Sequence, residues 1–437
     1  MANILIATFG SLGDLHPKIA IGLELKKRGH NVTFAVMEFY REKIEMLGFY
    51  FRPLAPHLDP DDRDLARELM DKNKGTERII RDLIMPNLRQ MYENLTDAAS
   101  HADIMITGEV VYAAKSVTEK TGIKWVTTTL APVSFMSAYD PPVPAPAPQF
   151  ENLRFLGPTF HRYFYKFLRW HIRDWYEPYR EFRRGLDLDN SDDPIFGEKY
   201  SPLLHLVLFS KVLGQRQPDW PAHALQTGFC FYDGKDDLGK MPEGLGEFLD
   251  SGDPPVVFTL GSAAVMDAGN FFDESLQAAA GLKRRALLIY GVYNEPPDGA
   301  DFEVTNFGDG YLFRHKLTGI EAAAFQYAPY SRVFPLAACV VHQGGVGTTA
   351  QVLSAGVPQL FMPFSHDQPD NAARCRRLGV AEVITREIYQ AETAAETLRK
   401  ILGTPAYAEK ARAISKIVAA EKGTEHACDA IEAALSK

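Results

Sequence analysis

The chain has 437 residues, too many for one ordinary hydrophobic core, and this length predicts two domains of roughly 200 residues each. Hydrophobic residues make up 46% and charged residues 24%, as in soluble globular proteins, and a formal net charge of −9 argues against general nucleic-acid binding. The four cysteines lack a zinc-ligand or C-x-x-C spacing, the N-terminus lacks the pattern of a secretion signal, and no apolar run approaches about 18 residues. We therefore expect a cytoplasmic protein with reduced thiols and no transmembrane segment.

The first half of the chain alternates short apolar runs with helical patterns. Residues 3–9 predict a buried strand, which is followed by the turn GSLGDLHP at 10–17 and by a helix that ends at Gly29. Further strands, each short enough and apolar enough to be buried on both faces, are predicted at residues 31–37, 49–54, 102–108, 124–130 and 205–210. Together these runs predict a parallel sheet of the doubly wound type.

The second half repeats this plan from about residue 226. Its apolar runs predict strands at residues 256–262, 286–291, 338–345 and 359–364. The fold class that follows is α/β, with two tandem Rossmann-like doubly wound domains that face each other across a cleft. Such a cleft is a common place for a small-molecule site.

A glycine-rich turn follows the strand at 338–345. The sequence runs from ACVV through His342 into GGVGTT, so backbone N–H groups and two hydroxyls stand at a helix start, which suits a phosphate. Asp367 and Gln368 follow the next strand, where side chains emerge into the ligand crevice of an open α/β sheet. These features together predict a nucleotide-sugar site.

The segment 150–182 departs from the α/β plan because it holds twelve aromatic residues. Near-helical spacing relates Phe160, Phe164, Phe167, His171 and Trp175. One interpretation is a helix that packs on the core of its own domain, and a second is an insertion that lines an apolar acceptor pocket. A third is contact with an anionic membrane surface, because basic residues are interleaved with the aromatic ones: Arg162, Lys166, Arg169, Arg173, Arg180, Arg183 and Arg184.

The motifs at 10–17 and 342–368 resemble those of nucleotide-sugar-dependent glycosyltransferases of the two-domain B-type fold, of the family 1 type. Residues 327–368 resemble the donor-binding box of the plant secondary-product enzymes, and GSLGDLHP resembles the GSRGDVQP start of sterol-type enzymes. The resemblance spans nearly the whole chain. It implies an acceptor-binding domain at 1–220, a nucleotide-sugar donor-binding domain at 221–405, and a C-terminal helix at 406–437 that packs back on the first domain.

The resemblance also implies a set of donor-binding residues. Tyr327 would stack on the nucleobase, and the backbone of Ala328 would bond to its edge. The diphosphate would be held by two loops, which contain Gly261, Ser262, His342, Gly344, Gly345, Gly347, Thr348 and Thr349. A helix N-terminus and a donating histidine can stabilise the charge on a departing nucleotide, so no metal and no cofactor besides the nucleotide sugar are expected. The alternative for His342 is a histidine satisfied at a strand end.

The sugar itself would be bound by Asp367 and Gln368, which match the acid–amide pair of the family. A carboxylate and an amide can each accept from a hydroxyl while the amide donates to another. In the plant enzymes this glutamine accompanies glucose-type donors, so UDP-glucose is the expected donor. The glutamate that binds the ribose diol in those enzymes falls on Ala350, with Gln351 beside it, and this departure leaves a thymidine-linked donor open.

The first domain should supply the catalytic base. Asp14 matches the base aspartate of the sterol and antibiotic branches, and His16 stands two residues further along the same helix start. An imidazole with a pKa near 6.5 suits proton removal near neutral pH. Glu109 lies near the position of an acid that orients the base. The alternatives are a capping role for Asp14 or His16 and a solvated loop position for Glu109.

The sequence therefore predicts an inverting, metal-independent glycosyltransferase that moves a hexose onto a hydroxyl of a hydrophobic small molecule, such as a terpenoid, sterol, flavonoid or macrolide. Its expected partners are a nucleotide sugar and that acceptor, with no nucleic acid, and with membrane contact only of the peripheral kind. A nucleotide-sugar epimerase of the same fold and a non-catalytic lipid-binding protein are the alternatives. A nicotinamide oxidoreductase that uses Glu38 is a third, but GSLGDL lacks the G-x-G-x-x-G pattern. The acceptor and the oligomeric state are not predicted.

Overall fold

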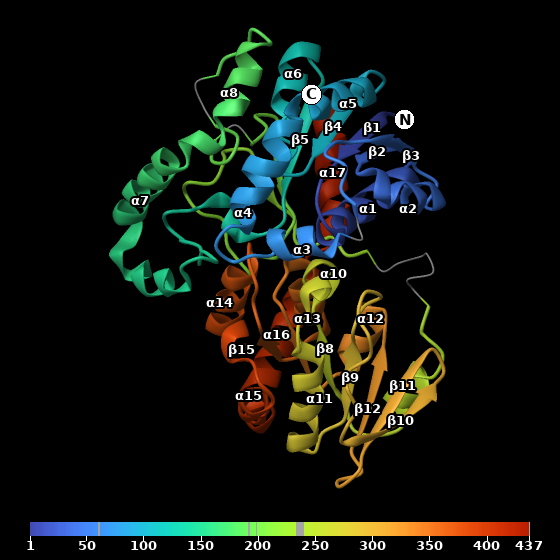
Figure 1. Cartoon of the computed structure of the whole chain (residues 1–437). Helices are drawn as coiled ribbons and strands as arrows, with labels where there is room; N and C mark the ends of the chain where they lie inside the picture. The colour runs from blue at the N-terminus through green and yellow to red at the C-terminus, as the bar shows by residue number, and fades with distance from the viewer. Residues whose placement is uncertain (60–61, 191–192, 198, 233–239, 437) are drawn as a thin grey trace. The chain divides into compact units, whose positions relative to one another are not determined.

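The computed structural model describes residues 1–59, 62–190, 193–197, 199–232 and 240–436 (Figure 1). The chain divides into two compact units. Unit 1 comprises Met1–Asp62, Lys72–Tyr232 and Glu421–Lys437, and unit 2 comprises Arg63–Asp71 and Asp233–Ala420. These ranges differ from the domains expected from the sequence, because residues 221–232 fall in unit 1 and residues 63–71 and 406–420 fall in unit 2.

Among the described residues of unit 1, seven strands form one parallel sheet in the order β3-β2-β1-β4-β5-β6-β7. The strands are β1 (Asn3–Ala7), β2 (Asn31–Val36), β3 (Tyr50–Pro53), β4 (Ile104–Thr107), β5 (Lys124–Thr129), β6 (Leu204–Val207) and β7 (Ala224–Gln226). The predicted parallel, doubly wound sheet is confirmed. The edge strand β7 was not predicted, because three residues with one buried side chain give no apolar run.

The helical segments of unit 1 are α1 (Leu12–Lys27), η1 (Glu38–Tyr40), α2 (Arg41–Met46), α4 (Gly75–Glu77), η2 (Arg78–Ile84), η3 (Met85–Asn87), α5 (Leu88–Ala99), α6 (Ala114–Thr121), η4 (Pro132–Phe135), η5 (Pro148–Leu156), α7 (Gly157–His171), η6 (Arg173–Trp175), α8 (Glu177–Arg184) and α17 (Gly423–Leu435). Helix α1 begins before Pro17, where the helical pattern was expected to start. The reason is a capping box: the Ser11 hydroxyl accepts the Gly13 N–H, and the Asp14 carboxylate accepts the Ser11 N–H.

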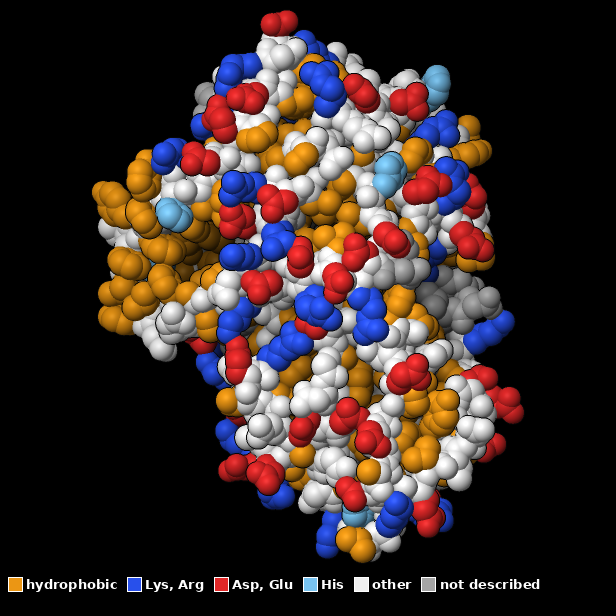
Figure 2. Space-filling model, in the orientation of Figure 1, with side chains coloured by type: hydrophobic (Ala, Val, Ile, Leu, Met, Phe, Trp, Pro, Cys, Tyr) orange, Lys and Arg blue, Asp and Glu red, His pale blue; other side chains and the backbone are white. Residues whose placement is uncertain are grey.

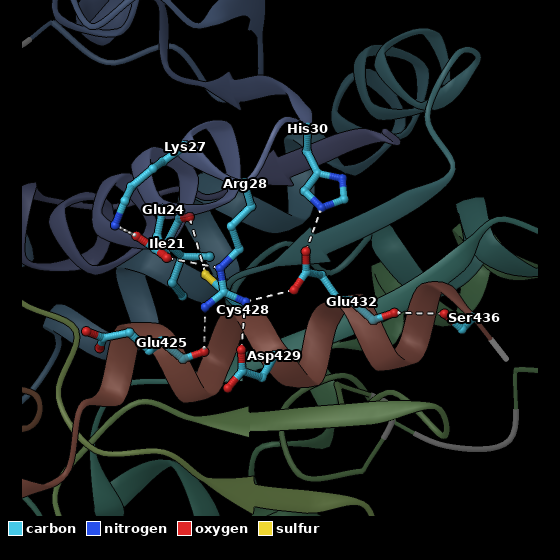
Figure 3. Close-up of polar contacts among 10 residues, drawn as sticks. All are labelled: Ile21, Glu24, Lys27, Arg28, His30, Glu425, Cys428, Asp429, Glu432 and Ser436. Carbon is cyan, nitrogen blue, oxygen red and sulfur yellow. Dashed lines mark hydrogen bonds and ion pairs between the residues drawn. The ribbon is translucent and has the colours of Figure 1, made fainter.

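The C-terminal helix α17 packs on α1 inside unit 1 (Figure 3). The Arg28 guanidinium, at the end of α1, donates to the carboxylates of Asp429 and Glu432, each at 2.7 Å. The His30 ring lies 2.9 Å from the other oxygen of Glu432. These charged contacts therefore connect the last helix of the chain to the first one.

Among the described residues of unit 2, eight strands form a mixed sheet in the order β10-β11-β12-β9-β8-β13-β14-β15. The strands are β8 (Val256–Thr259), β9 (Ala286–Ile289), β10 (Phe302–Phe307), β11 (Gly310–His315), β12 (Glu321–Phe325), β13 (Cys339–His342), β14 (Gln359–Phe361) and β15 (Ala381–Val383). Strand β11 is antiparallel to both β10 and β12, and the other pairs are parallel. The β10–β11 hairpin was not predicted, because β10 is an edge strand with mostly exposed side chains.

The helical segments of unit 2 are α3 (Arg63–Leu69), α9 (Leu245–Asp250), α10 (Gly261–Ala264), η8 (Val265–Asp267), α11 (Phe271–Leu282), α12 (Tyr330–Val333), η9 (Phe334–Leu336), α13 (Val346–Ala355), α14 (Gln368–Leu378), η10 (Arg386–Ile388), α15 (Ala391–Gly403) and α16 (Pro405–Ala420). Alternate residues of the central strands enter two different core clusters, with Phe258 and Val341 in one and Val257 and Val340 in the other. Both faces of the central sheet are therefore covered, as a doubly wound fold requires.

Helix α3 belongs to unit 2 although it lies in the first half of the chain. Its last residue, Leu69, has its carbonyl 2.9 Å from the ring of His366, and Arg67 pairs with Asp267 at 3.3 Å. His366 has a φ of +57°, a left-handed conformation that is uncommon for a residue with a side chain. Helix α3 thus packs beside the loop that leads into Asp367.

Candidate functional site

The strand order of unit 2 places three loops beside one another, beyond the carboxyl ends of its central strands. The chain runs from β8 to β9 and on to β12 on one side, then returns to β13, β14 and β15 on the other side of β8. Strands β8 and β13 are therefore neighbours at a topological switch point, where open α/β sheets bind ligands beyond the carboxyl ends of the strands. The loops after β8, β13 and β14 carry Gly261, the 344–349 turn and Asp367, respectively.

The turn after β13 opens helix α13. Gly344 has a φ of +99°, which favours glycine, and Gly345 is the N-cap of the helix. The first backbone N–H groups of a helix have no acceptor within it, so those of Gly347 and Thr348 point out of the helix start. The Thr349 hydroxyl is buried and donates to the Gly344 carbonyl at 3.3 Å, so it fixes the turn. Thr348 is nearly buried beside it.

His342 lies beneath this turn with a fully buried ring. Its Nδ1 accepts the Gly344 N–H at 3.1 Å, so Nε2 carries the proton and donates to the Gln359 Oε1 at 3.0 Å. Burial lowers the pKa of His342 to about 4, and the bond to Gln359 opposes that shift. The ring is therefore neutral and holds the turn in place. This set of contacts differs from the one expected of a histidine that donates directly to a phosphate.

Gln343 lies between the two glycine turns, and the sequence did not single it out. A Cβ atom on Gly261 would collide with the Gln343 amide nitrogen, and one on Gly345 would lie 3.0 Å from the same atom. The side chain is 5% exposed, and its Oε1 is buried without a hydrogen-bond partner among the described residues. Gly261, with a φ of +64°, therefore allows the amide to fill the gap between the turns. Ser262 follows it and is exposed.

Asp367 and Gln368, the acid–amide pair, both accept hydrogen bonds from backbone N–H groups at the same end of the sheet. The Asp367 carboxylate accepts the Val346 N–H of α13 at 3.0 Å and the Asn371 amide at 2.7 Å. The Gln368 Oε1 accepts the Phe364 N–H at 2.8 Å, which leaves the donor end of its amide without a bond inside the described parts of the chain. Asp367 and the α13 start are thus joined by a hydrogen bond, and Gln368 begins α14 next to them.

Tyr327 and Ala328, which were predicted to bind the nucleobase, lie after β12. In the sheet, β9 separates this strand from β8. Tyr327 is 36% exposed, whereas Ala328 is buried. Tyr330, three residues further on, bonds through its hydroxyl to the Thr259 hydroxyl at the end of β8, at 2.7 Å. This bond anchors the segment that carries Tyr327 to the strand that leads into Gly261.

In unit 1 the switch point falls between β1 and β4, and the predicted catalytic residues lie at the carboxyl ends of these two strands. Asp14 is held in the capping box of α1, and burial raises the pKa of its carboxyl. A Cβ atom on Gly10 would collide with this carboxylate, so the turn requires glycine there. His16 is half-buried on the same helix, with its ring centre 5.1 Å from that of Tyr232.

Glu109 follows β4 and is held by two partners. It accepts the Leu130 N–H at 3.3 Å and lies 3.6 Å from the ammonium of Lys199. A second lysine, Lys18, is buried one turn after Asp14 and donates to the Asp14 carbonyl at 2.9 Å. Two carboxylates and two ammonium groups are thus gathered around this switch point. The lysines were not predicted, because neither stands in a motif and the burial of Lys18 and Lys199 depends on tertiary packing.

Two family models match the chain. The model of the glycosyltransferase family 28 N-terminal domain matches residues 4–137, and the model of the C-terminal domain of erythromycin biosynthesis protein CIII-like proteins matches residues 319–433. The chain is also 32% identical to O-mycaminosyltylonolide 6-deoxyallosyltransferase of Streptomyces fradiae, over 98% of this chain and 97% of that protein. The chain belongs to the glycosyltransferases of the two-domain B-type fold. The family expected from the motifs is confirmed.

Further relatives and solved structures are consistent with this membership. The glycosyltransferase is 28% identical to the vancomycin aglycone glucosyltransferase of Amycolatopsis orientalis, over 86% of this chain and 84% of that protein. Two crystal structures share its fold: the glycosyltransferase of kitacinnamycin, with a TM-score of 0.68 and 21% identity, covering 99% of each chain, and VinC in complex with dTDP, with a TM-score of 0.66 and 18% identity, covering 100% of each chain.

The described residues of this glycosyltransferase contain neither a candidate metal site nor a helix that could span a membrane. No three His, Cys, Asp or Glu side chains gather there as ligands for a metal ion. In the same residues no helix combines the length and the apolar character that crossing a bilayer demands.

Proposed function

We propose that this glycosyltransferase moves a hexose from a nucleoside-diphosphate sugar onto a hydroxyl of a hydrophobic small molecule of the macrolide or antibiotic-aglycone type. The observation that carries the proposal is the meeting of three loops at the switch point of unit 2. There, two glycine turns, a helix start and an acid–amide pair lie at the ends of adjacent strands. The names of the curated relatives, which include a tylonolide and a vancomycin-aglycone enzyme, support the acceptor class.

In this proposal the start of α13 receives the diphosphate. The outward N–H groups and the positive end of the helix dipole stabilise the charge that grows on the leaving nucleotide, without requiring a metal ion. His342 acts as a positioning residue, because its Nδ1 holds the Gly344 amide and its ring is neutral. The Gln343 amide nitrogen, which lies against both glycine turns, and the amide nitrogen of Gln368 are side-chain donors at this end of the sheet. Asp367 both orients the helix start and accepts from a sugar hydroxyl.

The transfer itself is an inverting displacement. The acceptor hydroxyl loses its proton to Asp14 or His16 as its oxygen attacks the anomeric carbon, and the bond from that carbon to the diphosphate oxygen breaks from the opposite face. The capping box restricts the Asp14 carboxylate to the α1 start, where the Ser11 N–H bonds to it. Glu109 and Lys199 form the charged surroundings of this base.

UDP-glucose is the donor favoured by the acid–amide pair, and a dTDP-hexose is the second candidate. Ala350 stands where plant enzymes carry the glutamate for the ribose diol, and this alanine is buried. A donor that lacks the ribose 2′-hydroxyl would not need that glutamate. Solved relatives of the same fold include complexes with thymidine diphosphate, which supports the second candidate.

The test is a transfer screen that pairs UDP-glucose, UDP-galactose and dTDP-glucose with macrolide aglycones, terpenoids and phenols, in the presence of EDTA. We expect transfer to at least one macrolide-type acceptor, with the anomeric configuration of the donor inverted in the product. A strict requirement for added metal would contradict the leaving-group assignment. Conversion of the donor in the absence of any acceptor would instead indicate an epimerase. If the protein neither turned over nor bound the donor, only the lipid-binding alternative would remain.

A further inference from the structure

Helix α7 carries two apolar faces, and only one of them packs on its own unit. The inner face holds His161, Phe164, Tyr165 and Leu168, which are buried or half-buried. The second face consists of Leu156, the N-cap residue just before α7, and of Phe160, Tyr163, Phe167 and Trp170, whose exposed fractions are 40%, 38%, 68%, 56% and 58%. We call these five residues the outer aromatic face. The interpretation of the aromatic segment as a helix packed on the core of its own domain is therefore wrong for this face.

The outer aromatic face is continuous. Its residues recur at alternating intervals of four and three, which places them in one stripe along the helix. Phe155, which precedes Leu156 in η5, is also 81% exposed. Hydrophobic side chains gather over α7 at the left of the space-filling view (Figure 2). Single exposed apolar residues are ordinary on a protein surface, but a contiguous patch of this kind marks an interaction site.

Two uncompensated cations flank this face. The Arg162 guanidinium lies over the Tyr139 ring at 5.0 Å, and the Lys166 ammonium lies over the Tyr163 ring at 5.6 Å. Neither forms an ion pair with a carboxylate in the described part of the chain. In contrast, Arg169 pairs with Asp193 at 2.7 Å. A chain with a net charge of −9 thus presents unpaired positive charge among its exposed aromatic side chains.

We propose that the outer aromatic face of α7 docks this glycosyltransferase on an anionic lipid surface. Aromatic side chains with interleaved Lys and Arg suit the boundary between lipid headgroups and acyl chains, where the rings are buried and the cations meet lipid phosphates. A dimer formed through this face is less favourable than a lipid contact. In a two-fold contact the same patch meets itself, so Arg162 and Lys166 would face the same cations of the other copy.

The test measures partition of the whole protein onto vesicles, either of phosphatidylcholine alone or with about 30% phosphatidylglycerol. We expect binding to the anionic vesicles that weakens as salt rises from about 0.1 M to 1 M. Phe167→Ser and Trp170→Ser should each lower the partition coefficient roughly 10-fold. Arg162→Gln and Lys166→Gln should each lower it roughly 5-fold. These side chains are exposed, so the variants should unfold at the temperature of the parent protein.

Matched controls lie on other elements of the same unit. Tyr50→Ser removes a 66% exposed aromatic side chain from β3, and Lys120→Gln removes an exposed cation from α6; both should leave partition unchanged. No binding to anionic vesicles, or equal losses in the controls, would overturn the proposal. A concentration-dependent dimer that the α7 variants dissociate would overturn it in favour of a second copy. Loss of transfer to a water-soluble acceptor with unchanged vesicle binding would make the face an acceptor site instead.

Discussion

Lys18 places a positive charge under the turn that holds Asp14. It is 1% exposed, its ammonium donates to the Asp14 carbonyl, and a Cβ atom on Gly108 would lie 3.5 Å from its Nζ. Burial lowers the pKa of Lys18, while the charges of Asp14 and Glu109 oppose that shift. In the same way, burial raises the pKa of Asp14, and the charge of Lys18 is the largest opposing effect. The lysine therefore helps to keep the Asp14 carboxyl ionised.

Lys18→Met should consequently change the pH dependence of transfer. Without the ammonium, the pKa of Asp14 rises further, and the carboxyl is protonated over a wider range of low pH. A protonated carboxyl cannot accept the acceptor's proton, so the acidic limb of the kcat/KM profile should move up by about one pH unit. The free energy of unfolding should fall, because the substitution removes one partner of a buried charge pair and leaves the Asp14 carbonyl without its donor.

Lys27→Met is the matched control, since Lys27 lies on the same helix with a highly exposed side chain. Its pH profile should equal that of the parent protein. Lys18→Arg should restore part of the profile because it keeps the charge. An acidic limb that stays in place in Lys18→Met would show that Asp14 is not the group that titrates, and would favour His16 as the base.

The site residues show what a motif can and cannot predict at this scale. The motif correctly predicted that Gly344, Gly345 and Asp367 lie beyond the carboxyl ends of neighbouring strands, because strand ends and glycine turns follow from local sequence. It could not show that the His342 ring is turned inward to Gln359, since that depends on a neighbouring strand. Gln343 was overlooked for the same reason. Its burial between two turns is a property of tertiary packing.

At the scale of elements, α17 is held to α1 by a small charged network. The contact between His30 and Glu432 is the largest cause that lowers the pKa of this glutamate, and Arg28 adds to it. A carboxyl with a lowered pKa stabilises the folded state above its unfolded pKa, near 4.3, and this stabilisation is lost as the pH falls through the folded pKa. The contribution of Glu432 should thus be complete at pH 7 and absent in strong acid.

Glu432→Gln should lower the free energy of unfolding at pH 7 by about 0.5–1 kcal/mol, a small value because solvent screens this half-exposed pair. The difference from the parent protein should shrink below about pH 4. Urea unfolding at several pH values measures both effects. Glu425→Gln is the control, because that exposed carboxylate lies on the same helix and forms no ion pair among the described residues (Figure 3). Equal effects of the two variants at pH 7 would show that the network adds no stability.

Elements were predictable where burial follows a local pattern. The central strands β1, β4, β8 and β13 are continuous apolar runs, so their existence and type were evident from the sequence. The hairpin strand β10 has mostly exposed residues that alternate between apolar and polar types, so it forms no continuous apolar run. Helix α7 is an intermediate case: its aromatic spacing indicated a helix, but with apolar residues on two faces the sequence could not show which face packs inward.

At the scale of the whole molecule, the chain assembles two doubly wound units, each with its candidate residues at a switch point. This arrangement was predictable because each half repeats strand, glycine turn and helix. The exact membership of the units was not. Helix α3 joins unit 2 through contacts such as Leu69 with His366, and α17, which was expected on the first domain as a helix from residue 406, joins unit 1 through Arg28 only from Gly423 onward. These contacts join residues hundreds of positions apart, and nothing in the local sequence signals them.

The division into two units gives the donor assignment a test that does not depend on turnover. A ligand that binds only the folded state stabilises it by about 2.7 kcal/mol at a concentration of 100 times its Kd. Because the proposed diphosphate site lies wholly in unit 2, UDP or dTDP alone should raise the unfolding temperature of that unit, by several degrees for roughly 200 residues. A chain of two units need not unfold in one step, so the thermal transition of unit 1 should respond less.

Gly261→Ala should remove this thermal shift. The added Cβ atom would collide with the Gln343 amide and lie 3.3 Å from the Thr348 hydroxyl, so it would displace groups in the gap between the two glycine turns. Gly319→Ala is the matched control, because Gly319 has a similar φ of +69° but a Cβ there meets no described atom within 4 Å. Both variants carry the same left-handed strain, and Gly261→Ala should lose more stability without nucleotide because of the added collision. Only Gly319→Ala should keep the nucleotide-induced shift, measured by calorimetry. A shift retained in both variants would place the nucleotide away from the β8 and β13 turns, and a shift lost in both would show that the effect is not specific to Gly261.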